Sequence, residues 1–104
     1  MEDRLEELRI RNRLRGVSRR LARNNQAPHN ADRALWGTLA MVTFANVAGL
    51  SGDLKVDPET ALGDLLADLM HWCDVHRTNN SVTGSVDFES ALRRARDHHR
   101  EERR

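Results

Sequence analysis

The sequence predicts an all-α protein, with four helices packed as one bundle-like domain over residues 1–104. Apolar residues recur at helical spacing in four segments. The composition is 38% hydrophobic and 32% charged with two Pro, which is typical of a globular helical chain and excludes a disordered one. A length of 104 residues suits a single core. Together these features disfavour β-sandwiches and barrels.

The first helix is predicted over residues 3–23. Acidic residues at its start complement the positive end of the helix dipole. Its apolar positions form one narrow stripe, made of Ile10, Leu14, Val17 and Leu21. Gly16 lies in the middle of this segment and costs about 1 kcal/mol relative to Ala. The pattern favours one helix, with or without a kink at Gly16, and a break there with Ser18 capping a second helix is the alternative.

The second helix is predicted over residues 31–48, after a loop in which Asn30 is placed to cap it. Apolar residues surround this helix, so we expect it to be central in the bundle, and a second subunit in a homodimer is another way to cover it. Gly49 followed by Leu50 predicts a left-handed cap at its end. A membrane span is the competing interpretation, but polar residues and Gly37 interrupt the apolar run.

Two further helices are predicted over residues 58–76 and 88–102. Asp57 and Pro58 mark the start of the third helix, and Asp87 is placed to cap the fourth. The third helix is predicted to have a broad apolar face, made of Leu62, Leu65, Leu66, Leu69, Met70, Trp72 and Cys73. The stretch between the two helices is rich in Asn, Ser, Thr and Gly, which is typical of a loop.

Composition also limits the classes of function. The chain has no Tyr, two Phe and two Trp, too few aromatic residues for a platform that stacks single-stranded bases. Its one cysteine, Cys73, cannot form an internal disulfide, and the acidic N-terminus lacks the apolar segment of a secretory signal. We therefore expect a cytoplasmic protein that is not held in a membrane.

No group of residues predicts catalysis, a metal site or a cofactor. Asp68 and His71 are three positions apart, but they share a polar helix face with Asp64 and supply too few ligands. His98 and His99 are adjacent on a helix, so they point about 100° apart. The sequence contains no glycine-rich phosphate loop and no cluster of Cys and His.

The charge distribution is the most distinctive feature of the sequence. Residues 9–23 hold seven Arg and no acid, whereas residues 53–74 hold six acids and Lys55. The predicted partner-binding residues lie on the first helix: Leu5, Leu8, Arg9, Arg13, Arg15, Arg19, Arg20 and Arg23. Leu5 and Leu8 lie away from the apolar stripe, and exposed clustered leucines indicate an interface. The arginines could bind an acidic protein, nucleic acid, or the chain's own acidic third helix.

Two segments carry a resemblance to known proteins. Residues 61–74 (ALGDLLADLMHWCD) and 87–98 (DFESALRRARDH) resemble a helical hairpin in short uncharacterised bacterial, phage and plasmid proteins. This resemblance covers about 40% of the chain and implies a mobile-element or accessory gene. The hairpin is more faintly similar to the last two helices of MazG-like nucleotide pyrophosphohydrolases. Of the magnesium-binding carboxylates in that family, Asp64 matches, but Ala61 stands in place of a glutamate, which argues against the activity.

These observations predict a non-catalytic protein-interaction module, with a mobile-element accessory or anti-defence protein as its specific form. Its partner would be a host protein or nucleoprotein that presents an acidic surface. The first alternative is a nucleic-acid-binding regulator that uses the arginine-rich first helix. The second is a divergent MazG-like nucleotide hydrolase.

Overall fold

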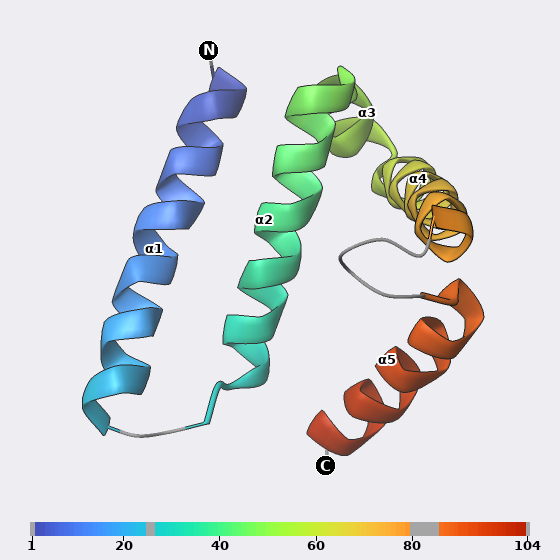
Figure 1. Ribbon diagram of the computed structural model, residues 1–104. Coiled ribbons are helices and arrows are strands. Elements are labelled where there is room, and N and C mark those ends of the chain that lie inside the picture. Colours follow the sequence, from blue (N-terminus) through green and yellow to red (C-terminus); the bar gives the residue numbers. More distant parts are fainter. Residues whose placement is uncertain (1, 25–26, 80–85, 104) are drawn as a thin grey trace. The chain divides into compact units, whose positions relative to one another are not determined.

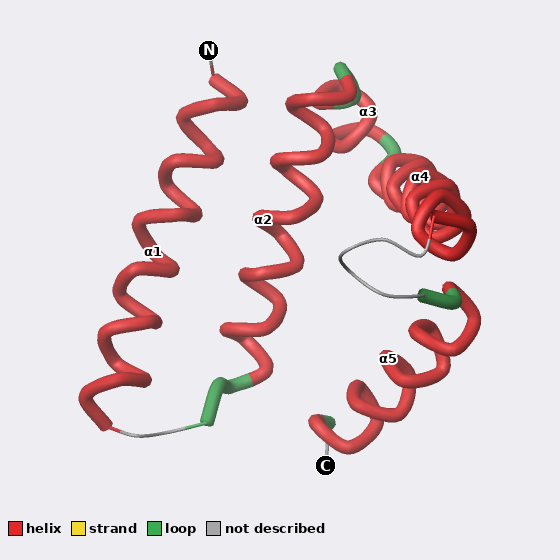
Figure 2. The backbone as a smooth tube through the Cα atoms, viewed as in Figure 1, coloured by secondary structure: helices red, strands yellow, loops and turns green. Residues whose placement is uncertain are grey.

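The computed structural model describes residues 2–24, 27–79 and 86–103, and in these ranges all regular secondary structure is helical (Figures 1 and 2). Five helices follow one another: α1 (Glu2–Asn24), α2 (Asn30–Ala48), α3 (Ser51–Val56), α4 (Pro58–Asn79) and α5 (Phe88–Glu102). The predicted all-α fold class is confirmed. The short helix α3 was not predicted.

The chain divides into two compact units, Met1–Leu62 and Gly63–Arg104, and α4 passes from the first unit into the second. The first unit contains α1, α2, α3 and the beginning of α4. The second unit contains the rest of α4 and α5. A single domain over residues 1–104, and its completion by dimerisation, stay predictions.

α1 is one helix from Glu2 to Asn24 and continues through Gly16, so the alternative break at that residue does not occur. Gly16 is exposed, and a Cβ atom added to it would meet no atom within 4 Å. The glycine is therefore tolerated at the usual cost in helix propensity without a packing requirement.

The core of the first unit lies where α1 packs against α2, as the predicted apolar stripe of the first helix requires. Ile10 and Leu14 of α1 are buried with Val42 of α2. The partly buried residues that pack against this cluster are Leu35, Leu39 and Leu54. Since the connection between α1 and α2 is short, the two helices run antiparallel and side by side (Figure 1).

The two ends of α2 differ in how closely they follow the prediction. The N-cap is His29 rather than the predicted Asn30, which begins the helix, because the Asp32 carboxylate accepts the His29 N–H at 2.9 Å. At the other end Gly49 is left-handed, with φ 76° and ψ 26°, as predicted. The Leu50 N–H donates to the Ala45 carbonyl at 2.8 Å, which completes the cap.

α2 is the middle helix of the first unit because it packs against α1 and against α3. The second of these contacts is made by the short α3, which the sequence does not predict. α3 has six residues and includes Gly52, which gives little local signal for a helix. Its Leu54 packs against the core, so tertiary contact stabilises this helix.

Apolar residues on α2 and α4 are more exposed than their patterns predict. On α2 the buried residues are Asp32, Val42 and Ala45, whereas Trp36 and Val47 are exposed. Part of the apolar surface of α2 is therefore exposed in the single chain, and its covering by a second subunit stays a prediction. On α4, Cys73 is buried as predicted, but six large apolar residues are exposed: Leu62, Leu66, Leu69, Met70, Trp72 and Val75.

The starts of α4 and α5 agree with the predicted caps. Asp57 accepts the Thr60 N–H at 3.3 Å and the Thr60 hydroxyl at 2.6 Å. Asp87 accepts the Ser90 N–H at 3.0 Å and its hydroxyl at 2.9 Å. Both hydrogen bonds from Thr60 lower the pKa of Asp57 below its ordinary value of 3.8, and the bond from the hydroxyl has the larger effect.

Candidate partner-binding surfaces

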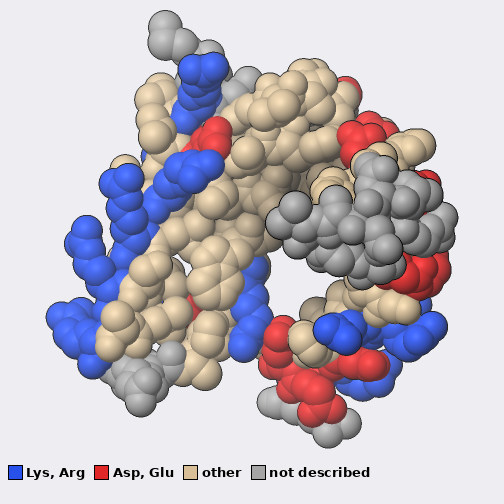
Figure 3. Space-filling model, in the orientation of Figure 1, with Lys and Arg blue, Asp and Glu red and all other residues tan. Residues whose placement is uncertain are grey.

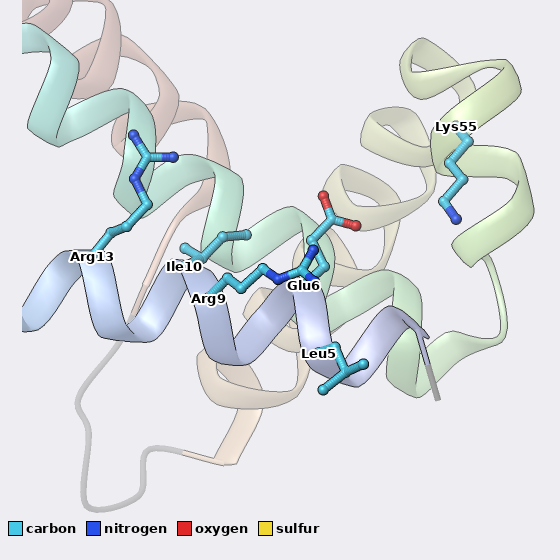
Figure 4. A pocket seen from close by; sticks show the side chains of 6 residues that line it. All are labelled: Leu5, Glu6, Arg9, Ile10, Arg13 and Lys55. Atoms are coloured by element: carbon cyan, nitrogen blue, oxygen red, sulfur yellow. The ribbon is translucent and has the colours of Figure 1, made fainter.

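A hollow of about 660 Å³ lies on the first unit, at the side of α1 that faces α3 (Figure 4). We call it the α1–α3 hollow, and it is lined by Leu5, Glu6, Arg9, Ile10, Arg13 and Lys55. Five of these residues come from three successive turns of α1. Lys55 extends from α3 on the opposite side (Figure 4).

The α1–α3 hollow combines positive charge with apolar surface. Arg9, Arg13 and Lys55 are exposed cations, and Glu6 is the single acid of the lining. Leu5 is 49% exposed, whereas Ile10 is 5% exposed and belongs to the core. The hollow can therefore receive a ligand that presents both a carboxylate and an apolar group. Lys and Arg side chains gather along α1 in the space-filling view (Figure 3).

Leu8 lines a different hollow from Leu5, although both leucines lie on α1. This second hollow is lined by Arg4, Glu7, Leu8, Arg11, Thr43, Asn46 and Val47. Two of its charged groups are engaged with each other, because the Glu7 carboxylate accepts Arg11 Nη2 at 2.9 Å, and Glu7 also accepts the Thr43 hydroxyl at 3.0 Å. Asn46 Nδ2 also donates to Glu7, at 3.3 Å.

The hydrogen bonds around Glu7 tie α1 to α2. The bond from Arg11, followed by the bond from Thr43, lowers the pKa of Glu7 below its ordinary value of 4.5, although partial burial opposes this shift. The carboxylate thus stays ionised and serves as a structural acceptor. This hollow consequently offers less positive charge to a partner than the α1–α3 hollow does.

Arg20 is engaged within the chain. Its guanidinium forms an ion pair with Asp32 of α2, whose side chain is 7% exposed. The His29 N–H lowers the pKa of Asp32 most, burial opposes this effect, and the Arg20 charge lowers the pKa further. Arg20 therefore fixes α1 against the start of α2 and is not presented to a partner as Arg9 and Arg13 are.

The remaining predicted arginines lie on an exposed side of α1. Arg19 and Arg23 flank Ala22 in a shallow surface patch, and Arg15 donates to the Asn12 side chain at 3.2 Å. All three arginines are exposed. The large apolar residues of the α1–α3 hollow have no counterpart in the lining of this patch.

Other candidate chemistry is not assembled in the part of the chain that the structure describes. Asp64, Asp68 and His71 are exposed on α4, and the described residues contain no group of three or more His, Cys, Asp or Glu that could hold a metal ion. Among the described helices, none is both long enough and apolar enough to cross a bilayer.

No protein-family model, curated protein or solved structure matches this chain.

The contacts or positions of three charged side chains were not predicted from the sequence. In the sequence, Lys55 is an isolated base within an acidic segment. In the structure, α3 brings Lys55 to the side of Arg9 and Arg13. Glu7 and Asp32 have the sequence context of helix-end acids, although each contacts the neighbouring helix. For Glu7, Thr43 was the available signal, because a partly buried hydroxyl requires a hydrogen-bond partner.

Proposed function

We propose that this chain is a non-catalytic protein-interaction module and that the α1–α3 hollow binds an acidic segment of a partner protein. The observation that carries the proposal is that two exposed arginines, Arg9 and Arg13, line one hollow together with the half-exposed Leu5. Charged groups of one sign steer an oppositely charged partner, whereas apolar contact supplies much of the affinity.

The exposed side chain of Leu5 favours a protein partner at this position. Protein interfaces place an apolar or aromatic anchor in a central pocket and surround it with polar groups. Leu5, which is half exposed, can contact such an anchor, while Arg9 and Arg13 can pair with carboxylates beside it. A Leu or Phe flanked by Asp or Glu has the required chemistry.

The proposal can be tested with a display library of random peptides about twelve residues long, selected against the full chain. We expect the selected peptides to contain Asp or Glu next to Leu or Phe. The double variant Arg9→Glu/Arg13→Glu should lower their affinity roughly tenfold or more, because it reverses the charge on one side of the hollow. The affinities can be measured by fluorescence anisotropy.

The matched control is Arg15→Glu/Arg19→Glu, which makes the same change in net charge on the exposed side of α1. Peptide binding should persist in this variant. Binding that is lost equally in both double variants would indicate general attraction to a basic helix. In that case the α1–α3 hollow would not be the site. Selection of peptides without acidic residues would also contradict the proposal.

A further inference from the structure

A second basic surface lies on α5, within the second unit. It consists of Arg93, Arg96, Arg100 and Arg103, which we call the α5 arginine row. Their spacing of three, four and three residues places them on one side of the helix. At 1.5 Å of rise per residue the row is about 15 Å long. All four side chains are exposed, and three of the residues line a shallow hollow together with His99.

The helix dipole does not account for this row. Basic residues are favoured in the last turn of a helix, where they interact with the free carbonyl groups, and His99 and Arg100 occupy that turn of α5. The row begins earlier, however, with Arg93 and Arg96. Since the dipole effect falls off within one turn, it does not account for these two arginines.

Acidic neighbours leave most of the row unneutralised. Arg100 pairs with Asp97 at 3.5 Å, and both side chains are more than half exposed, so this pair is weak. Within the described ranges, the side chains of Arg93, Arg96 and Arg103 form no ion pair with a carboxylate. At least three guanidinium groups are thus available to an external anion.

The surroundings of the row distinguish it from the α1–α3 hollow. Residues 96–103 include no apolar side chain, so this end of α5 lacks the anchor that a protein interface needs. A duplex nucleic acid presents about one phosphate per 1.7 Å of its axis and needs no such anchor. We infer that the α5 arginine row binds the phosphate backbone of duplex nucleic acid, independently of base sequence.

The salt dependence of DNA binding tests this inference. A labelled duplex of mixed sequence, titrated with the full chain at salt concentrations from about 50 to 200 mM, should give a plot of log K against log salt that falls by about 0.9 for each phosphate bound by an arginine. The triple variant Arg96→Gln/Arg100→Gln/Arg103→Gln should reduce that slope by about 2.7. It should also weaken binding at about 0.1 M salt by roughly tenfold for each arginine replaced.

Arg15→Gln/Arg19→Gln/Arg23→Gln on α1 is the matched control, since it removes the same charge and should leave the slope nearly unchanged. Gln retains good helix propensity, and far-UV circular dichroism checks that both variants keep their helices. Several outcomes overturn the inference: absent binding at about 50 mM salt, a slope reduced only in the α1 variant, or equal competition by polyglutamate at matched charge, which would indicate an acidic protein instead.

Discussion

Replacing Gly16 by Ala is expected to stabilise the protein. Gly16 lies inside α1, is exposed, and has open space where the new methyl group would be. The substitution therefore changes helix propensity and the entropy of the unfolded chain without changing a tertiary contact. From these terms we expect a gain of about 1 kcal/mol in the free energy of unfolding, or a rise in Tm of roughly 4–8 °C for a unit of this size.

Thermal and urea unfolding followed by far-UV circular dichroism measure this effect. Gly49→Ala is the control because it makes the same chemical change where φ is 76° and nothing lies within 4 Å of the new atom. The left-handed conformation costs a non-glycine residue about 1–2 kcal/mol, so this variant should lose stability. A loss of stability in Gly16→Ala would refute the reasoning and support a break of α1 at Gly16 with Ser18 as the cap.

Three further predictions concern the first unit and the helix caps. Leu14→Ala should lower the free energy of unfolding in urea by about 2–5 kcal/mol, because Leu14 is buried in the core; a change below about 0.5 kcal/mol would contradict the described packing. The pKa values of Glu7, Asp32 and Asp57 are lower in the folded state than their ordinary values of 4.5, 3.8 and 3.8. The stability that these carboxylates contribute should therefore be constant at neutral pH and fall as the pH drops through those ordinary values. The contribution of each carboxylate is lost once the pH falls below its folded pKa, and urea midpoints that rise with acidification would refute this assignment. Asp32→Asn should be less stable than the wild type at neutral pH and lose less stability on acidification, and an unchanged pH profile would show that Asp32 is not linked to folding.

Most of the local structure is determined by the sequence itself. The stripe of Ile10 and Leu14 predicts the buried face of α1, and Asp57 and Asp87 predict the helix starts. Gly49 predicts the left-handed cap of α2. These features depend on helical periodicity and on hydrogen bonds between residues three or four positions apart, so the neighbouring residues contain the necessary information.

The tertiary structure decides which of the seven arginines in residues 9–23 are available to a partner. Arg19 and Arg20 are adjacent and chemically identical, yet Arg19 is exposed while Arg20 pairs with Asp32. The packing of Ile10 and Leu14 against α2 sets the register of the two helices. That register brings the pair together across 12 positions of sequence. No local pattern specifies such a contact.

The α1–α3 hollow likewise depends on contacts between residues that are distant in the sequence. α3 is too short to be predicted from propensity, and it forms where Leu54 reaches the core shared by α1 and α2. Its formation brings Lys55 to the side of Arg9 and Arg13. The sequence determined that this protein is helical and where its charges lie along the chain. Only the packing of distant segments decided which charges and apolar groups share one surface, because that depends on contacts between residues far apart in sequence.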